Sequence, residues 1–310
     1  MKTQKTIYII GAGAIGKALA TFLSYEGKEV IILRGSVDDH SDYVEKISIE
    51  LNNSAEIQAD LRISTISNVS QLDGIVVLTN KSYGNQRLAG LLKMKIKNSP
   101  IILLQNGLAI EEPFIHEGYS QIYRCVLFAT SQFSSINKLR FKPVAVSPVG
   151  VIKGDSETLF MIINAINTTW FRFIAEQTIQ PVIWTKAIVN CVFNSICPLL
   201  ETDNGIFYRD KEALHIARRI IAECIAVASL HGVILDIKKV EESLLLISRE
   251  SEGQLISTYQ DIANKRRTEI DSLNFTFVHL ADELKKHELT KETKLLGELI
   301  RIKSGLNCNF

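Results

Sequence analysis

The chain has 310 residues, of which 46% are hydrophobic and 22% are charged, so it is long enough for two domains that each bury a core. Its 35 basic and 34 acidic side chains leave a formal net charge of +1. This balance argues against nucleic acid or a membrane surface as the main partner, because both attract broadly basic proteins. No apolar run reaches the ~20 residues that a membrane-spanning helix needs. The five cysteines form no CxxC pair and the six histidines are scattered, so we expect reduced thiols, no metal site and a cytoplasmic protein.

The first thirty-odd residues carry a strand–turn–helix–strand pattern. Residues 6–10 are apolar on both faces, as in a buried parallel strand, and a helix to about residue 26 and a second strand over residues 29–33 follow. Between the first strand and the helix stands a G-x-G-x-x-G turn, whose glycines permit the tight turn, the approach of a pyrophosphate and close packing of the helix. The helix N-terminus adds free N–H groups and a partial positive charge. The pattern predicts that a dinucleotide binds at Gly11, Ala12, Gly13, Ala14, Ile15 and Gly16.

Arg34 follows the second predicted strand directly, where NAD-dependent enzymes usually carry Asp or Glu for the ribose hydroxyls. A guanidinium is a planar, permanently charged fork that suits a 2′-phosphate, and Ser36 can add a hydroxyl. A carboxylate at this position would repel that phosphate. We therefore predict NADPH rather than NADH as the cofactor; the alternative is that Arg34 is only a solvated loop charge.

The alternation of strands and helices continues after this unit. Residues 74–78 and 100–104 are each expected to form a buried strand that ends in a polar cluster, and ligands of open parallel sheets bind beyond such strand ends. Residues 122–130 are predicted to form a further strand. Residues 138–151 are expected to be an antiparallel, hairpin-like segment punctuated by two prolines. These elements predict an α/β fold with a doubly wound sheet.

From about residue 176 onward the pattern is helical. We therefore predict two domains, a dinucleotide-binding domain over residues 1–176 and an all-α domain over residues 177–310. In the first helix of the second domain Lys186, Asn190 and Asn194 recur at every fourth position and share one face. A solvated face is the simple alternative, but asparagine is a poor helix former, which favours a stripe that faces a cleft.

Taken together, these motifs resemble ketopantoate reductases, the NADPH-dependent 2-dehydropantoate 2-reductases of pantothenate biosynthesis. The resemblance runs from about residue 6 to about residue 275 and rests on the order and spacing of the whole set. That set comprises the glycine turn, Arg34, Lys81, Gln105-Asn106-Gly107, Lys186-x3-Asn190-x3-Asn194, Asn204-Gly205, Ser257-x2-Gln260-Asp261 and Thr268-Glu269-Ile270-Asp271. It implies a Rossmann domain joined to a helical domain of the 6-phosphogluconate dehydrogenase-like kind, with the active site in the cleft between them.

The resemblance also implies a role for each matching residue. Arg34 and Lys81 would hold the 2′-phosphate, and Asn106 would lie where nicotinamide meets the substrate. Lys186 would be the catalytic general acid, which stabilises and protonates the alkoxide that hydride delivery to a ketone creates. Glu269 would be its partner carboxylate. Substrate binding would fall to Asn106, Asn190, Asn194, Asn204 and Ser257.

Two positions near the substrate side depart from the family's usual pattern, Ser195 and Gln254. These departures leave a second hypothesis open, that the chain is an NADPH-dependent reductase of another 2-oxo acid. A third hypothesis, a non-catalytic NADPH sensor, is disfavoured because the set around Lys186 and Glu269 is intact. Members of the family are monomers or dimers, so a homodimer is also open.

Overall fold

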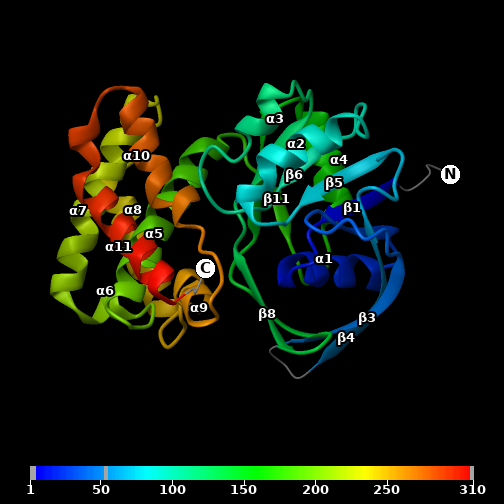
Figure 1. Ribbon diagram of the computed structural model, residues 1–310, viewed down its shortest axis with the longest axis horizontal. Helices are drawn as coiled ribbons and strands as arrows, with labels where there is room; N and C mark the ends of the chain where they lie inside the picture. The colour runs from blue at the N-terminus through cyan, green and yellow to red at the C-terminus, as the bar shows by residue number, and fades with distance from the viewer. Residues whose placement is uncertain (1–4, 52–54, 308–310) are drawn as a thin grey trace. The chain divides into compact units, whose positions relative to one another are not determined.

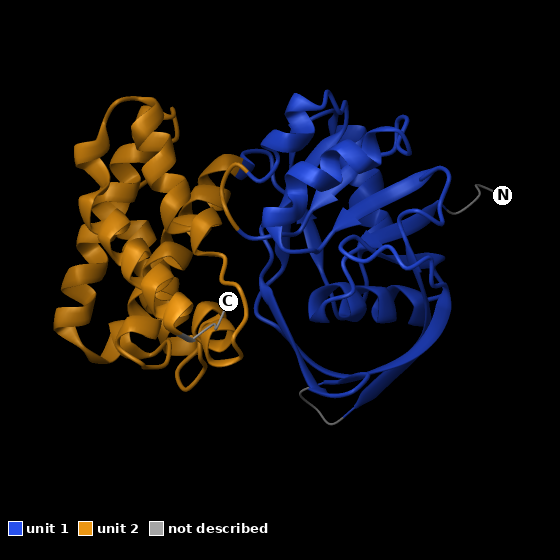
Figure 2. Ribbon diagram, viewed as in Figure 1, with its two compact units in different colours: residues 1–106, 110–179 blue, residues 107–109, 180–310 orange. Residues whose placement is uncertain are grey.

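The computed structural model describes residues 5–51 and 55–307, which fall into two compact units (Figure 2). Unit 1 comprises residues 1–106 and 110–179, and unit 2 comprises residues 107–109 and 180–310. The expected boundary after residue 176 lies next to this division. The short segment 107–109 belongs to the helical unit, which the local sequence did not indicate.

Unit 1 is built on one eleven-stranded sheet with the order β11-β10-β7-β6-β5-β1-β2-β4-β3-β9-β8 (Figure 1). The strands from β4 through β2, β1, β5 and β6 to β7 are all parallel. The chain passes from β1 to β2 on one side and later to β5 on the other, so the strand order reverses beside β1, as at the ligand-binding crevice of doubly wound folds. The strands are β1 (Thr6–Ile10), β2 (Val30–Arg34), β3 (Tyr43–Glu50), β4 (Glu56–Thr65), β5 (Gly74–Leu78), β6 (Ile101–Leu103), β7 (Ile122–Cys125), β8 (Ala129–Ser135), β9 (Lys138–Pro143), β10 (Ser147–Lys153) and β11 (Phe173–Ala175).

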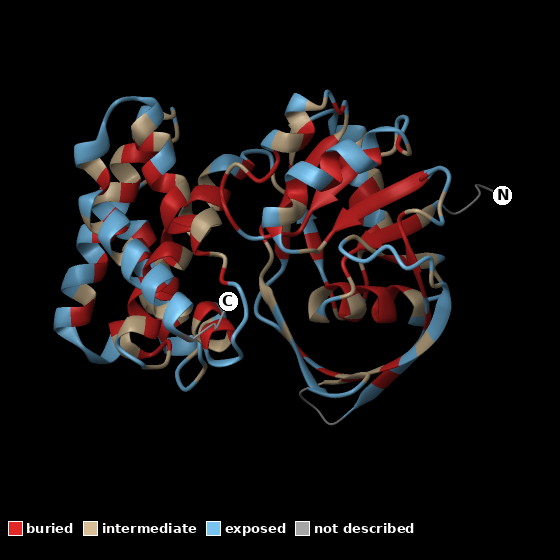
Figure 3. Cartoon of the chain, in the orientation of Figure 1, coloured by how far each residue is buried: buried red, intermediate tan, exposed pale blue. Residues whose placement is uncertain are grey.

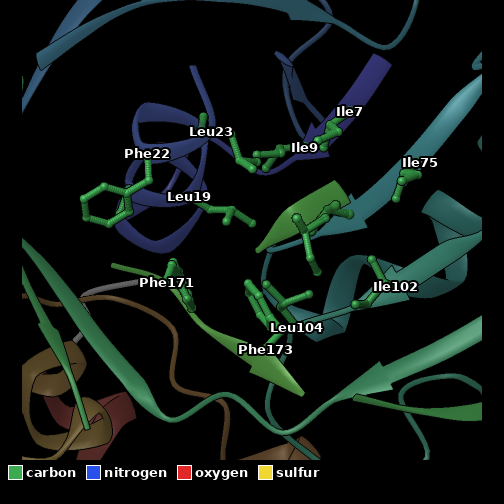
Figure 4. Close-up of a cluster of buried hydrophobic side chains, with 14 of the residues drawn as sticks. Ile7, Ile9, Leu19, Phe22, Leu23, Ile75, Ile102, Leu104, Phe171 and Phe173 are labelled. Atoms are coloured by element: carbon green, nitrogen blue, oxygen red, sulfur yellow. The ribbon is translucent and has the colours of Figure 1, made fainter. Parts of the chain in front are cut away.

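Helices cover both faces of this sheet. Successive side chains of a strand point to opposite faces, and β1 shows the result: Ile7 and Ile9 join one hydrophobic cluster while Tyr8 and Ile10 join another. The first cluster contains side chains of α1 and α4, and the second contains side chains of α2 and α3. Figure 4 shows the α1 residues of the first cluster, among them Phe22, beside the strand residues. The helices of unit 1 are α1 (Ala14–Tyr25), α2 (Asn85–Lys93), α3 (Glu112–His116) and α4 (Ser156–Ile166), with a short 3-10 turn η1 (Ser82–Gly84).

The outer part of the sheet differs from the sequence-based expectation. Residues 122–130 do not form one strand, because β7 ends at Cys125 and β8 begins at Ala129. Residues 138–151 are not a hairpin either: β9 is antiparallel to β8, and β10 is antiparallel to β7. After β7 the chain therefore crosses to the other end of the sheet, makes the β8–β9 hairpin with β9 beside β3, and returns as β10 beside β7. Local sequence shows antiparallel character but not the partner, which is set by long-range pairing.

Within the residues that the structure describes, all regular secondary structure of unit 2 is helical. Its longest helix, α5, is long and apolar enough by composition to cross a membrane, but 72% of its apolar window is buried inside the structure. Figure 3 colours the chain by burial, with buried residues in red. Trp184 of α5 contacts Phe277 of α10, and Phe193 contacts Phe207 of α6, so aromatic rings join α5 to its neighbours. The helices are α5 (Ile179–Leu199), α6 (Ile206–Arg209), α7 (Lys211–Leu230), α8 (Ile237–Glu250), α9 (Ser257–Ala263), α10 (Asn274–Glu283) and α11 (Lys291–Asn307), with 3-10 turns η2 (Ile270–Ser272) and η3 (His287–Thr290).

Candidate functional site

The glycine turn between β1 and α1 is sterically tight at two positions. Gly11 has φ +126°, and a Cβ there would lie 2.6 Å from the Asn80 backbone N and 2.6 Å from Thr79 Oγ1. A Cβ on Gly16 would lie 2.0 Å from the Gly11 carbonyl oxygen. Thr79 Oγ1 donates a hydrogen bond to the same Gly11 carbonyl oxygen at 3.0 Å. The end of β5 and the first turn of α1 thus approach each other at a distance that only glycine permits.

Gly13 differs from these two glycines, because no described atom lies within 4 Å of where its Cβ would be. It is also the N-cap of α1, and no side chain caps that helix. The first N–H groups of a helix have no intrahelical partner and attract an anion. The turn is therefore open at the point where a pyrophosphate would approach, and the residues present fit a dinucleotide.

Arg34 ends β2, and its side chain is paired within the chain. Nη1 donates to Asp39 Oδ2 at 3.1 Å, and Nη2 donates to Asp39 Oδ1 and to Ser41 Oγ. Hydrogen bonding to Asp39 raises the pKa of Arg34, and hydrogen bonding to Arg34 holds the pKa of Asp39 well below its usual range. The position of Arg34 after a strand is evident in the sequence, but its pairing with Asp39 is not, although the next eight residues include Asp38, Asp39 and Asp42.

A second basic residue lies near this strand end. Arg87 of α2 reaches the Gly35 carbonyl oxygen with Nη1 at 3.5 Å, although it is 52 positions away in the chain. A Cβ on Gly35 would contact Ile10 and Leu88, so the segment after Arg34 lies over the end of β1 and against α2. Sequence analysis did not single out Arg87, and its position on a solvated helix face carries no local signal.

Lys81 and Asn106 are both exposed and follow β5 and β6. A pair of buried amides ties their two loops together: Asn85 Nδ2 donates to Gln105 Oε1 at 2.9 Å, and Gln105 Nε2 donates to Asn85 Oδ1 at 2.8 Å. Gln105 Nε2 also donates to the Asn80 carbonyl at 2.8 Å, and Asn85 Nδ2 to the Ile110 carbonyl at 2.9 Å. Because buried amides are costly unless satisfied, this network specifies one arrangement of the loops.

A buried ion pair lies just beyond the Asn106 loop. Arg124 of β7 donates from Nη1 to Glu111 Oε2 at 3.2 Å, and the two side chains are only 3% and 9% exposed. Burial lowers the pKa of Arg124, and the Glu111 carboxylate opposes that shift. Nothing in the local sequence predicts the pair, because its members belong to different elements.

In unit 2, the polar stripe of α5 lies as the spacing predicts, on successive turns of one helix. Lys186 and Asn190 are half-buried and Asn194 is 2% exposed. Asn194 Nδ2 donates to the Asn190 carbonyl at 2.9 Å, while its Oδ1 accepts from Ser257 Oγ at 3.1 Å. The same Oδ1 accepts from the Thr258 backbone N at 3.2 Å. Asn194 therefore ties the start of α9 to α5, which brings two of the predicted substrate residues together.

Asn204 lies in the segment that precedes α6. Its backbone N donates to the Gln254 carbonyl at 2.9 Å, and its carbonyl accepts from Ser248 Oγ at 2.7 Å. Its side-chain Oδ1 is buried and has no hydrogen-bond partner among the described residues. An orphaned buried acceptor of this kind is the sort of group that a ligand hydroxyl satisfies.

Glu269 lies at the start of η2, in the same unit as Lys186, and is half-buried. Its carbonyl accepts from the backbone N and the Oγ of Ser272, both at 3.0 Å. The backbone thus places Glu269 at a defined position between α9 and α10.

Two family models cover most of the chain. The model described as "Ketopantoate reductase PanE/ApbA" matches residues 7–142, and the one described as "Ketopantoate reductase PanE/ApbA C terminal" matches residues 178–303. The chain belongs to the ketopantoate reductase family. The sequence-based family assignment is thereby confirmed, as is the fold class of a Rossmann-type α/β domain followed by an all-α domain.

Curated relatives extend over nearly the whole chain. A 2-dehydropantoate 2-reductase of Pyrococcus horikoshii is 25% identical over 277 residues, which are 89% of this chain and 90% of the relative. A 2-dehydropantoate 2-reductase of Streptococcus pyogenes serotype M3 is 24% identical over 306 residues, 97% of this chain and 98% of the relative. The family makes this chain an oxidoreductase.

Solved structures share the fold. A PanE/ApbA family ketopantoate reductase from Ralstonia eutropha matches with a TM-score of 0.82 at 22% identity, covering 97% of this chain and 99% of its own. D-mandelate dehydrogenase, solved with NADH and anilino(oxo)acetate, matches with a TM-score of 0.83 at 23% identity over the same shares. One fold of this kind therefore occurs in enzymes that are named for different substrates.

Proposed function

We propose that this ketopantoate reductase family member reduces 2-dehydropantoate to pantoate with NADPH, as a cytoplasmic enzyme of pantothenate biosynthesis. The observation that carries the proposal is the arrangement on α5. Lys186 lies two helical turns before Asn194 and Asn190 lies one turn before it, and Asn194 is hydrogen-bonded to Ser257. An ammonium beside several neutral hydrogen-bonding groups suits a substrate that has a ketone, a hydroxyl and a carboxylate.

In unit 1, the glycine turn would hold the pyrophosphate, since Gly13 leaves the N-terminus of α1 open. Arg34 and Lys81 would hold the 2′-phosphate, and Asn106 would lie beside the nicotinamide and the substrate. When bound, NADPH supplies the hydride. The amides of Asn85 and Gln105 keep the loops of Lys81 and Asn106 in one arrangement.

In unit 2, Lys186 would act as the general acid, holding the proton that the substrate's C2 oxygen takes up. Glu269 would orient Lys186 or the substrate. The side chains of Asn190, Asn194, Asn204 and Ser257 would hold the substrate's hydroxyl and carboxylate, and the orphaned Oδ1 of Asn204 is the acceptor best suited to a hydroxyl.

The proposal is tested by following NADPH oxidation by absorbance with 2-dehydropantoate and with a panel of other 2-oxo acids. We expect 2-dehydropantoate to give the highest kcat/KM, with NADPH preferred to NADH. Binding of NADPH without oxidation by any member of the panel would favour a sensor and overturn the proposal.

The panel includes benzoylformate, the 2-oxo acid that corresponds to mandelate, because D-mandelate dehydrogenase shares the fold. A higher kcat/KM for such an acid would leave the reaction type in place and change the substrate. Ser195, which is fully buried and donates to the Cys191 carbonyl at 2.7 Å, would then be the first position to vary.

A homodimer is proposed as the assembly, supported by a dimeric ketopantoate reductase from Staphylococcus aureus with a TM-score of 0.80 at 17% identity. Light scattering of the purified chain at several concentrations tests it, and a monomer mass throughout would contradict it.

A further inference from the structure

The charged fork of Arg34 is already engaged by a carboxylate of its own chain. Asp39 accepts from both Nη1 and Nη2, in the bidentate arrangement that a phosphate would also use. Ser41 Oγ takes a further hydrogen of Nη2, and the buried Nε has no hydrogen-bond partner among the described residues. A 2′-phosphate could therefore accept from Nη1 and Nη2 in this bidentate way only by taking the place of the Asp39 carboxylate.

The loop that presents Asp39 is held in place from β4 and the turn after it. Asn68 Nδ2 donates to the His40 carbonyl at 3.0 Å, and Arg62 binds the Asp42 carboxylate through Nε at 3.2 Å and Nη2 at 2.7 Å. The Ser41 backbone N donates to Asp39 Oδ1 at 3.0 Å. These hydrogen bonds thus hold the Asp39 carboxylate in a defined position beside Arg34.

The neighbouring carboxylates of this loop have other partners. Asp38 accepts from Ser67 Oγ, and Asp42 accepts from Arg62. Asp39 is therefore the loop carboxylate that the structure assigns to Arg34. Glu241 offers a matched control, since it makes the same bidentate carboxylate–guanidinium pair with Arg218, a residue of unit 2 that we place at neither site.

We propose that Asp39 is a specificity-determining residue, whose carboxylate competes with the 2′-phosphate of NADPH for Arg34. This inference rests on the proposed binding of NADPH at Arg34. A phosphate carries more negative charge than a carboxylate, so it displaces Asp39 when NADPH binds. Displacement breaks the ion pair and leaves two anions close together, which lowers the affinity for NADPH relative to NADH.

The Asp39→Asn variant keeps the size of the side chain and removes the competing charge. An ion pair whose carboxylate is half-exposed to solvent contributes little, so we expect about a two- to fivefold tighter binding of ligands with a 2′-phosphate. Ligands without that phosphate should bind as before. The gain should shrink as ionic strength rises, because Asp39 is 49% exposed and its charge is screened.

The test is calorimetric titration of the whole chain with adenosine 2′,5′-bisphosphate and with adenosine 5′-monophosphate, which differ only in the 2′-phosphate and require no turnover. The wild type is compared with Asp39→Asn, with Glu241→Gln as the matched control and with Arg34→Gln. We expect Asp39→Asn to raise the preference for the 2′-phosphate, Glu241→Gln to leave it unchanged, and Arg34→Gln to lower it to what Lys81 alone provides.

The outcomes separate this inference from the proposed function. If the wild type prefers the 2′-phosphate and Asp39→Asn leaves that preference unchanged or lowers it, Asp39 does not compete with the phosphate. The proposal that NADPH is the cofactor is then retained. If the wild type shows no preference but Asp39→Asn gains one, Asp39 competes and NADPH is not the natural cofactor. Weaker binding of both ligands to Asp39→Asn would mean that the carboxylate binds the ribose, which overturns the inference.

Discussion

The two units build their candidate sites from different parts of the chain. In unit 1 the cofactor turn is a backbone feature, in which Gly11 and Gly16 permit a close approach and Gly13 leaves space. In unit 2 the candidate substrate site is made of side chains from separate helices, and Asn194 links α5 to α9 across 63 positions. A backbone site depends on local residues and can be read from a motif, whereas a side-chain site exists only once the helices have packed.

The largest expected effect lies in the side-chain site. Replacing Lys186 by Ala should lower kcat by about 10²–10⁴-fold, the usual contribution of a positioned general acid. Affinity for NADPH, measured by fluorescence titration, should stay the same, because the cofactor turn belongs to unit 1. Lys211→Ala, an exposed lysine of the same unit, is the control. A Lys186→Ala variant with nearly normal turnover would remove the catalytic assignment.

An intermediate effect is expected in the backbone site, where two glycines should respond differently to the same methyl group. Gly16→Ala places a Cβ against the Gly11 carbonyl and should destabilise the protein by about 1–3 kcal/mol, as overpacking does. Gly13→Ala has room for its Cβ, so thermal unfolding should be unchanged. NADPH should nevertheless bind it about tenfold more weakly, which corresponds to ~1.4 kcal/mol, because the methyl group stands in the path of the pyrophosphate.

Thermal melts and NADPH titrations of these two variants decide between a binding turn and a merely structural one. Equal affinity of Gly13→Ala and the wild type for NADPH would show that the pyrophosphate does not approach at Gly13.

The smallest effect concerns the contact between α5 and α9. Ser257→Ala removes the hydroxyl that donates to Asn194 Oδ1, while the Thr258 backbone N keeps that oxygen satisfied. We expect KM for the 2-oxo acid to rise about fivefold, since one hydrogen bond contributes ~1 kcal/mol, with NADPH affinity unchanged. Thr276→Ala, which removes a hydroxyl bonded to the Asp271 carbonyl, is a matched control. A fall in kcat without a change in KM would instead place Ser257 in the chemistry.

The sequence by itself determined the family, the two-domain organisation, the α/β and all-α classes, the glycine turn and the identity of the candidate site residues. These follow from local patterns: the apolar β1, the G-x-G-x-x-G turn and the four-residue period of Lys186, Asn190 and Asn194 are each contained in a short stretch of chain.

Only the tertiary structure decided what those residues contact. The strand partners of β8, β9 and β10, the buried amides of Asn85 and Gln105, and the pairing of Arg124 with Glu111 join distant segments. Arg34 shows the difference most directly. Its charge at the end of a strand is evident in the sequence, but its pairing with Asp39 depends on a loop that Arg62 and Asn68 hold from β4 and the turn after it. Local pattern specifies which groups are present, and packing between distant elements determines which of them meet.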